Sequence, residues 1–260
     1  MTPMTEYVTA ADGTRIAFER AGAGPALLLL HCMGCNRTYW SESGYLDALS
    51  AYFTVASVDT RGFGESDAPS EPAAYAEERI LADVLAVADA LGVERFNVWG
   101  HSYGAVIARE LAATSDRVSH AVMVGNHFGA IFPPQRLAQA RADLEPLARA
   151  QASDDPATAL AELGIGQEER EEMLRFPART TLLNIESLSQ WPLTQPADLR
   201  CPTLVVTGSR DARVLAALES QRADIAAAGI IVVTLPDLDH GQLVTERATV
   251  MPAVLPFLMA

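Results

Sequence analysis

The stretch FNVWGHSYGAVIARELA, residues Phe96–Ala112, decides how this sequence folds. The run Phe96–Trp99 predicts a buried strand, and a helix is expected from about Tyr103. Between them Gly100-His101-Ser102-Tyr103-Gly104 fits the pattern G-x-S-x-G, in which a sharp strand-to-helix turn lifts a serine hydroxyl above the edge of a sheet. The two glycines are needed because side chains at those positions would clash in the crowded turn. Ser102 is therefore the candidate nucleophile.

Short apolar runs bounded by turn residues recur along the rest of the chain, and they predict strands. Between them lie stretches with helical spacing, clearest in Glu77–Leu91, where apolar residues recur every three or four positions. Strands that alternate with helices predict an α/β fold with a mostly parallel sheet flanked by helices. The predicted strands are Arg15–Arg20, Ala26–Leu30, Phe53–Val58, Phe96–Trp99, Ala121–Val124, Thr203–Thr207 and Ile230–Leu235.

Residues 128–196 interrupt this alternation with a charged segment rich in Ala, Arg and Glu that contains no strand candidate. We interpret the segment as a helical cap inserted into a core domain formed by residues 1–127 and 197–260. It leaves the sheet after Ala121–Val124 and returns before the next strand, so we expect both of its ends on the rim that carries Ser102. A run of surface helices is the simpler alternative, and only the position between two strands favours a lid.

A serine nucleophile needs a base and a carboxylate that orients the base, in the chain order Ser, Asp or Glu, His for this arrangement. Asp211 follows the predicted strand Thr203–Thr207, and His240 follows Ile230–Leu235. Because parallel strands bring their C-terminal ends together, the two loops and the Ser102 turn are expected in one crevice. Ser102, Asp211 and His240 form the predicted catalytic triad.

Other histidines and aspartates are weaker candidates for the base and the acid. Asp237 and Asp239 fit a role as turn formers, and Asp198 precedes its strand, at the wrong edge of the sheet. His240 is the histidine that follows the acid candidate in the chain. The competing histidines, all of which precede it, are His31, His101, His120 and His127.

The stretch LLLLHCMGC, residues 27–35, contains a Cys-x-x-Cys pair, Cys32 and Cys35. A thioredoxin-like redox centre would place such a pair at the start of a helix in a smaller βαβ unit, and a zinc site would need two further ligands at suitable spacing. The sequence has no second cysteine pair and no closely spaced histidine pair. We expect instead that the turn after this strand presents backbone N–H groups to the site. An oxyanion hole formed by the N–H groups of Met33 and Tyr103 is predicted.

The composition argues against several classes of function. Among 260 residues, 33 are acidic and 19 are basic, and the formal charge of −14 would repel nucleic acid and anionic membrane surfaces. All the basic residues are arginines, which removes mechanisms that depend on lysine. The longest aliphatic run near the start, Ala26–Leu30, is far too short to cross a bilayer, and the N-terminal residues lack the features of a signal peptide. We expect a reduced, cytoplasmic protein with no metal, no cofactor and no membrane partner, and the oligomeric state stays open.

Five motifs in order give the chain a resemblance to α/β-hydrolase proteins of the esterase, lactonase and non-haem haloperoxidase type. The resemblance extends over essentially the whole chain and implies the α/β-hydrolase fold. Two departures are visible: Cys32 stands where the family usually has a glycine, and the acid loop lacks the proline that commonly follows the aspartate. A serine rather than an aspartate at the elbow separates the chain from the epoxide hydrolases and haloalkane dehalogenases of the superfamily. The five motifs are His31–Trp40, Asp59–Ser66 (DTRGFGES), Gly100–Gly104, Gly208–Asp211 and His240-Gly241.

The resemblance implies a serine hydrolase that cleaves a small-molecule carboxylic ester or lactone through an acyl-enzyme on Ser102, without a cofactor. Three alternatives stay open: a C–C bond hydrolase or cofactor-free perhydrolase or haloperoxidase on the same triad, a non-catalytic binding protein on this fold, and a redox or metal protein based on the cysteine pair. The substrate pocket is expected to include residues near the predicted strand ends, although aromatic and histidine side chains there are more often simple core or lid packing. The pocket candidates are Cys32, Trp40, His127, Phe128 and Trp191.

Overall fold

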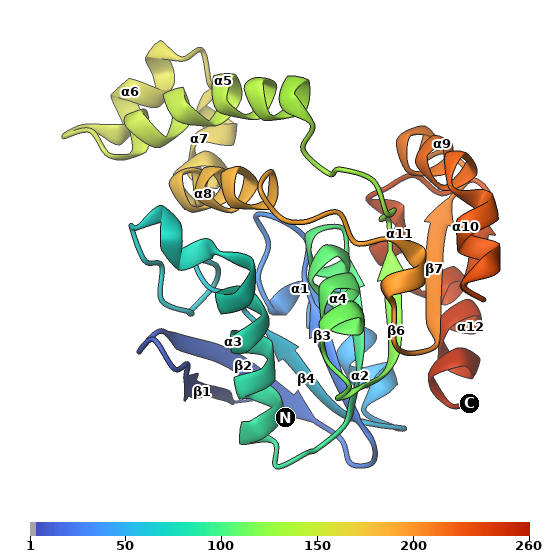
Figure 1. Cartoon of the computed structure of the whole chain (residues 1–260). Coiled ribbons are helices and arrows are strands. Elements are labelled where there is room, and N and C mark those ends of the chain that lie inside the picture. Colours follow the sequence, from blue (N-terminus) through green and yellow to red (C-terminus); the bar gives the residue numbers. More distant parts are fainter. Residues whose placement is uncertain (1–3) are drawn as a thin grey trace.

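The computed structural model describes residues 4–260 and contains an eight-stranded sheet with the strand order β1-β2-β4-β3-β5-β6-β7-β8 (Figure 1). β1 pairs antiparallel with β2, β2 pairs antiparallel with β4, and every other neighbouring pair is parallel. The α/β fold class predicted from the sequence is therefore confirmed. The strands are β1 (Thr5–Thr9), β2 (Arg15–Ala21), β3 (Ala26–Leu30), β4 (Thr54–Val58), β5 (Phe96–His101), β6 (Val118–Val124), β7 (Thr203–Gly208) and β8 (Ile231–Leu235).

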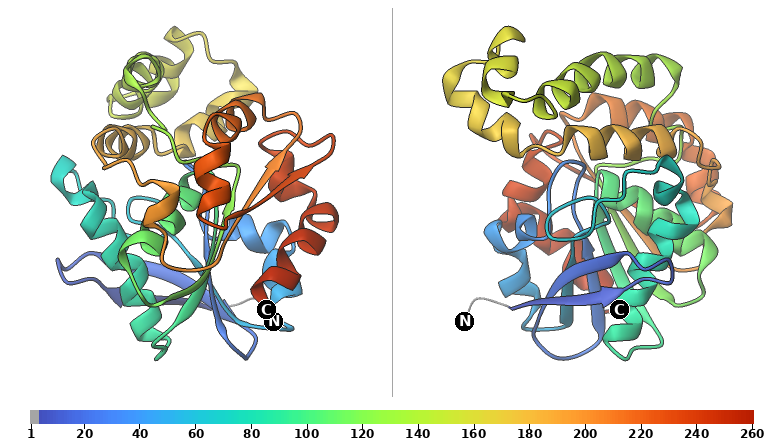
Figure 2. Two further views of the ribbon diagram at one scale, coloured as in Figure 1. Left: turned by 45° about the vertical axis from the view of Figure 1, so that its right-hand side comes forward. Right: turned by 90° about the vertical axis from the view of Figure 1, so that its left-hand side faces the viewer.

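Helices cover both faces of this sheet (Figure 2). On one face, strand residues such as Leu28 and Met123 pack against α3, α4, α9 and α10. On the other face, residues such as Trp99 pack against α1, α2, α11 and α12. Side chains that alternate along each strand thus give each face its own core. The helices are α1 (Thr38–Glu42), α2 (Tyr45–Leu49), α3 (Glu77–Ala90), α4 (Tyr103–Thr114), α9 (Ala212–Ser220), α10 (Arg222–Ala227), α11 (Gln242–Thr245) and α12 (Arg247–Leu258), with 3₁₀ turns η1 (Pro72–Tyr75) and η2 (Pro196–Asp198).

Each of the predicted strands is present, with ends that differ by at most three residues, and the predicted helix Glu77–Leu91 is α3. The sequence reasoning missed β1. Its residues, TEYVT, are mostly polar, and they are only partly buried because β1 is an edge strand. A strand of this kind carries little apolar pattern, so the pairing with β2 rather than local sequence defines it. No helix within residues 4–260 combines the length and the apolar character needed to cross a bilayer.

The insertion between β6 and β7, residues 125–202, forms four helices and no strand, and the structure describes all of it. These helices share an apolar cluster of their own, in which Leu160 is fully buried. They stand together beyond the end of the sheet toward which β6 and β7 point (Figure 1). The helices are α5 (Pro134–Gln151), α6 (Pro156–Glu162), α7 (Gln167–Arg175) and α8 (Ala178–Leu188).

Only one end of this insertion lies on the rim of the sheet where β6 ends. Since β6 and β7 run parallel, the start of β7 lies at the opposite end of the sheet, and the chain must travel that distance before it can pair. The return segment, residues 189–202, runs beside α4, where the Thr194 hydroxyl donates to the Glu110 carboxylate. The expectation that both ends of the insertion rest on the same rim is therefore wrong.

Candidate active site

Ser102 stands at a sharp turn between β5 and α4, as the sequence pattern predicts. Its backbone angles, φ 54° and ψ −104°, are rare for a residue other than glycine. A Cβ atom at Gly100 would lie 2.0 Å from the carbonyl oxygen of Gly104, and one at Gly104 would lie 2.1 Å from that of Leu30. The glycines therefore permit the close approach of the turn to β3, and the strain at Ser102 is of the kind found at functional sites.

The imidazole of His240 joins Ser102 to Asp211. Its Nε2 atom lies 3.0 Å from Ser102 Oγ, and its Nδ1 atom lies 2.6 Å from Asp211 Oδ2. An ionised carboxylate only accepts hydrogen bonds, so Nδ1 carries the proton and Nε2 is free to accept from the Ser102 hydroxyl. The structure thus brings the three predicted triad residues together, with the imidazole in the tautomer that a general base requires.

Asp211 is held in place by the start of α9. Its carboxylate accepts a hydrogen bond from the Val214 N–H at 3.3 Å, and the residue is only 6% exposed. Burial opposes ionisation, but the hydrogen bond and charge of His240, together with the Val214 N–H, hold the pKa of Asp211 below its ordinary value. The weaker candidate Asp239 instead accepts from the Gln242 N–H at 2.9 Å, as a turn former does.

Two residues directly after β6 support the site, and the sequence reasoning missed both. Asn126 is buried, and its Nδ2 donates to the backbone carbonyl oxygen of Ser102 at 2.8 Å. Gly125 has a φ of 66°, and a Cβ atom there would lie 2.9 Å from Cε1 of His240. A glycine followed by asparagine at the end of a buried strand indicates a turn with a close backbone approach, and this pattern was the available signal.

His101, a competing base in the sequence, contacts the backbone that carries His240. Its Nε2 atom lies 3.1 Å from the carbonyl oxygen of His240, and its Nδ1 atom lies 2.6 Å from the hydroxyl oxygen of Tyr39. Because a carbonyl oxygen only accepts, Nε2 carries the proton and Tyr39 donates to Nδ1. Burial, and then the charge of nearby His240, lower the pKa of His101 to about 3, so its imidazole is neutral near pH 7. His101 is therefore placed to position the loop of His240.

The loop after β3 is a tight turn fastened to the start of α4. The Cys35 N–H donates to the carbonyl oxygen of Cys32 at 3.2 Å, and Gly34 has a φ of 80°. The Gly104 N–H donates to the carbonyl oxygen of His31 at 3.1 Å. The turn after β3 and the Ser102 turn are thus held side by side by a backbone hydrogen bond.

The two predicted oxyanion donors are in this region. Met33, from the turn, and Tyr103, from the elbow, line one cavity together with Ser102. Within the described chain, neither the Met33 N–H nor the Tyr103 N–H donates to another backbone group. An oxyanion needs N–H donors that are not already bonded to a backbone acceptor, and both of these N–H groups meet that requirement.

The thiols of Cys32 and Cys35 contact each other rather than the cavity. The Cys32 thiol donates to Cys35 Sγ at 2.9 Å; this hydrogen bond raises the pKa of Cys32 and lowers that of Cys35. Cys32 does not line the cavity at Ser102, which corrects its assignment to the substrate pocket. No cluster of three or more His, Cys, Asp or Glu side chains in residues 4–260 is arranged to hold a metal ion.

The cavity at Ser102 is small, about 50 Å³. The turn after β3 and the elbow form part of its wall, and the insertion between β6 and β7 supplies much of the rest. Ligand sites for larger molecules occupy roughly 300 Å³ or more, so this cavity suits a short group unless the insertion moves. The lining residues are Met33, Ser102, Tyr103, Val106, Asn126, Ile131, Phe132, Arg136, Leu188 and Arg213.

The other residues expected in the substrate pocket also lie elsewhere. Trp40 is 1% exposed and packs against Trp99, with ring centroids 5.7 Å apart. Phe128 is fully buried beside Val214 on the opposite face of the sheet. Both rings are core residues because large apolar side chains beside strand ends gain more from burial than from lining a polar crevice. His127 lies behind the cavity wall, where its Nε2 atom is 3.1 Å from Arg213 Nη1.

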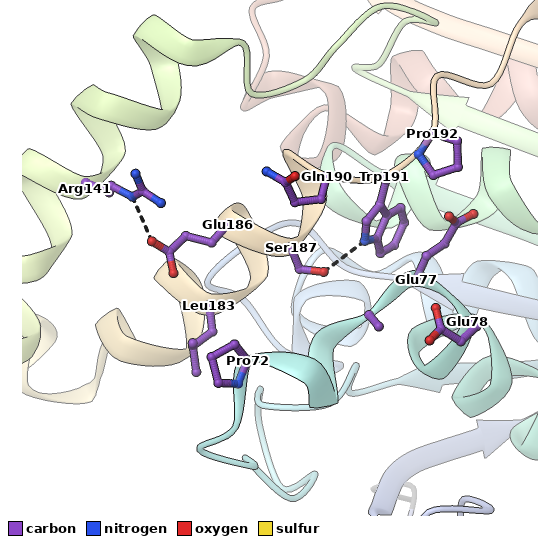
Figure 3. Close-up of a pocket in the computed structure, with 11 residues that line it drawn as sticks. Pro72, Glu77, Glu78, Arg141, Leu183, Glu186, Ser187, Gln190, Trp191 and Pro192 are labelled. Atoms are coloured by element: carbon purple, nitrogen blue, oxygen red, sulfur yellow. Dashed lines mark hydrogen bonds and ion pairs between the residues drawn. The ribbon is translucent and has the colours of Figure 1, made fainter.

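Trp191 lines a different cavity, of about 530 Å³, between α8 and the start of α3 (Figure 3). Its indole N–H donates to the Ser187 hydroxyl at 3.1 Å, and an ion pair between Arg141 and Glu186 lies nearby in the same cavity. No residue of the triad lines this cavity. Trp191 therefore packs the insertion against the core, away from Ser102.

Comparison with known proteins agrees with this fold. The sequence profile of the alpha/beta hydrolase fold matches residues 25–216. The solved structure of an enol-lactonase from Burkholderia xenovorans LB400 is 25% identical over 98% of this chain and 100% of that chain, with a TM-score of 0.74. That of a hydrolase from Pseudomonas aeruginosa PA01 is 27% identical over 100% of both chains, with a TM-score of 0.77.

Curated relatives are matched over shorter stretches. An uncharacterized protein of Mycobacterium tuberculosis is 39% identical over 115 residues, which are 43% of this chain and 32% of that protein. Epoxide hydrolase 2 of Siraitia grosvenorii is 32% identical over 126 residues, which are 47% of this chain and 39% of that enzyme. The chain thus matches only about a third of the length of these relatives. The profile match, by contrast, includes the turn after β3, the Ser102 turn and the loop that carries Asp211, and the chain belongs to the α/β-hydrolase fold family.

Proposed function

We propose that this protein is a serine hydrolase that cleaves carboxylic esters or lactones. The proposal rests on the position of the His240 imidazole, which is within hydrogen-bond distance of both Ser102 Oγ, at 3.0 Å, and Asp211 Oδ2, at 2.6 Å. This arrangement turns a serine hydroxyl into a nucleophile toward an acyl carbon. The similarity to an enol-lactonase over the full chain supports the choice of substrate class.

In the proposed reaction, Ser102 Oγ attacks the acyl carbon while its proton passes to His240 Nε2. The electron pair of the carbonyl double bond moves to oxygen, and the resulting oxyanion accepts hydrogen bonds from the N–H groups of Met33 and Tyr103. The C–O bond of the ester then breaks, and the departing alkoxide takes the proton from His240. Water repeats both steps on the acyl-enzyme, which releases the acid and restores Ser102, while Asp211 stabilises the charged imidazole throughout.

Partial similarity to epoxide hydrolases does not extend this proposal to epoxides. Attack of Ser102 on an epoxide carbon would leave an ether, which water does not cleave under these conditions. A carboxylate nucleophile would leave a hydrolysable ester instead, and the elbow carries a serine. A C–C bond hydrolase, a perhydrolase or a haloperoxidase would use the same three groups, and the products formed distinguish these reactions from ester cleavage.

We also propose that residues 128–196 act as a lid on a core domain of residues 1–127 and 197–260. Ile131, Phe132 and Leu188 from this segment line the cavity at Ser102. The lid is fastened at the elbow itself, because the Tyr103 hydroxyl donates to the Oδ1 atom of fully buried Asn184 at 2.7 Å. A lid in this position would exclude water from the acyl-enzyme and shape the pocket.

The test of the proposed function is covalent labelling with a fluorophosphonate probe, which loses fluoride when it phosphonylates an activated serine. The parent protein is expected to react with one equivalent of probe and to hydrolyse small activated esters. Ser102→Ala should abolish labelling and lower turnover by about a thousandfold or more. Ser220→Ala, at the exposed end of α9, is the matched control and should react like the parent. Undiminished labelling of Ser102→Ala would contradict the assignment.

A further inference from the structure

Two arginines line the cavity that contains Ser102. Arg136 comes from the first turn of α5, in the insertion, and Arg213 comes from the first turn of α9, two residues after Asp211. Both residues line the cavity and are also exposed to solvent, so they stand at its rim. The chain as a whole carries a formal charge of −14, so two positive groups beside Ser102 contrast with its excess of acidic residues.

Neither arginine has a carboxylate partner within the described residues, 4–260. None of the ion pairs of that part of the chain includes Arg136 or Arg213. Arg136 donates to the carbonyl oxygen of Ile131 at 2.7 Å and lies 4.8 Å from the centre of the Phe132 ring. Most of its donors therefore remain available to a ligand.

Arg213 shares the imidazole of His127 with a second donor. Arg213 Nη1 lies 3.1 Å from His127 Nε2, and the Gly129 N–H lies 3.0 Å from His127 Nδ1. Burial, and then the charges of Arg213, Arg109 and Arg136, lower the pKa of His127 to about 4, so the ring is neutral at pH 7. A neutral imidazole has one acceptor nitrogen, and two N–H groups are directed at the ring. It can therefore serve only one of them.

Both guanidinium groups lie in electropositive surroundings. The first turn of a helix carries a partial positive charge, so a cation there is destabilised rather than stabilised. The two groups also repel each other, and after burial this repulsion by Arg213 lowers the pKa of Arg136. The charge of Arg213 helps to lower the pKa of Asp211, but this carboxylate makes no ion pair with Arg213 and is already bonded to His240. Local rules broken in this way are typical of functional sites, where a ligand supplies the missing partner.

We propose that Arg136 and Arg213 bind a carboxylate of the substrate, and that the preferred substrates are esters or lactones that carry this second, anionic group. The inference rests on the proposed function of Ser102. Both arginines and Ser102 line one cavity of about 50 Å³. A substrate carboxylate bound by the arginines therefore lies only a few bonds from the carbonyl group that Ser102 attacks. Guanidinium groups suit this role because they bind the two oxygens of a carboxylate together. Short monoesters of dicarboxylic acids and carboxylated lactones fit the description.

The experiment compares two esters of the same shape. The anionic ester is the mono-4-nitrophenyl ester of glutaric acid, and the neutral one is 4-nitrophenyl 5-oxohexanoate, in which a methyl ketone replaces the carboxylate. Spontaneous hydrolysis is subtracted for each. The measured quantity is kcat/KM for the anionic ester divided by kcat/KM for the neutral ester. This ratio should exceed one in the parent protein, and Arg136→Met and Arg213→Met should each lower it by about tenfold or more. Added salt should lower the ratio of the parent as well.

Arg149→Met is the matched control, because it removes the same charge from an exposed position on α5 outside the cavity. Its ratio should equal that of the parent. An equal ratio in the parent and in both cavity variants would overturn the carboxylate assignment while leaving Ser102 as the nucleophile. If the parent hydrolyses neither ester, the proposed function fails, and calorimetric binding of glutarate itself then decides the inference. Glutarate must bind the parent and bind the Arg136→Met/Arg213→Met double variant at least tenfold more weakly, or the inference fails too.

Discussion

The imidazole of His101 donates to the backbone carbonyl oxygen of His240 at 3.1 Å, so the residue that precedes Ser102 also holds the loop that carries His240. The two rings lie 5.2 Å apart between their centroids. Tyr39 completes the arrangement, since its hydroxyl donates to the other nitrogen of His101 at 2.6 Å. The distance from His240 Nε2 to Ser102 Oγ therefore depends on His101, whose own hydrogen bonds go to Tyr39 and to the His240 backbone.

We expect His101→Leu to lower kcat while changing KM much less. The variant removes the hydrogen bond to the His240 backbone, and a base displaced by about 1 Å loses roughly a hundredfold in rate. Tyr39→Phe keeps the His101 ring and removes only the bond that orients it, so its loss should be smaller and in the same direction. Steady-state kinetics on a small activated ester test this. Equal rates for His101→Leu and the parent would show that the His240 loop needs no such support.

His101 also makes a pH dependence of stability that can be measured. Its pKa is about 3 in the folded chain and close to 6.5 when unfolded, so between these values the unfolded chain binds more protons. Stability should consequently fall as the pH is lowered from about 6.5 toward 3, at up to about 1.4 kcal/mol per pH unit. Urea unfolding of His101→Leu should show a shallower slope across this window. Comparison at pH 8, where the histidine is neutral in both states, isolates any packing loss.

Much of the fold and the relative placement of Ser102, Asp211 and His240 could be predicted from the sequence, because each of these residues lies within five residues after the end of a strand with a strong apolar pattern. Parallel pairing then brings their loops to one rim without knowledge of any side-chain contact. The edge strand β1 was not predicted because its residues are mostly polar and it is defined by its pairing with β2. The hydrogen bond from Asn126 to the Ser102 carbonyl oxygen was not predicted, because a turn after a strand indicates close contact of the backbone with another segment but does not identify that segment.

The walls of the cavity could not be predicted, for a different physical reason. Ile131 and Leu188 are separated by the whole of α5, α6 and α7, and they meet above Ser102 only because the insertion packs back on itself. Aromatic residues near strand ends, such as Trp40 and Phe128, looked like pocket walls but are buried in the core. The hydrophobicity of a side chain predicts that it is buried, but it does not predict which residues it packs against.

The thiol pair offers a prediction about the turn after β3. If Cys32 and Cys35 only shape the turn, Cys35→Ser should keep the backbone bond between these residues and leave ester hydrolysis within about tenfold. Chelators should have no effect. The measurements are kcat/KM for the variant and the metal content of the purified protein. One equivalent of zinc, or a loss of activity with a chelator, would favour the metal reading of the pair instead.

The last prediction concerns the lid and uses the separate apolar cluster of the insertion. Leu147 and Leu160 belong to this cluster, whereas Leu183 of α8 belongs to the main core, so residues 137–176 can be replaced by a short Gly/Ser linker without opening the sheet. Arg136 and the bond between Tyr103 and Asn184 remain in this variant.

The variant should stay folded and still hydrolyse a small activated acetate through Ser102, because Ser102, Asp211 and His240 are untouched. Because Ile131 and Phe132 line the cavity directly before α5, loss of the rest of this helix should loosen that wall, and selectivity between short and bulky acyl groups should fall by about tenfold or more. Circular dichroism checks the fold, and kcat/KM for an acetate and a panel of bulky esters checks selectivity. A folded variant with the selectivity of the parent would mean that the insertion does not form the lid, since nothing else in the variant has changed near Ser102.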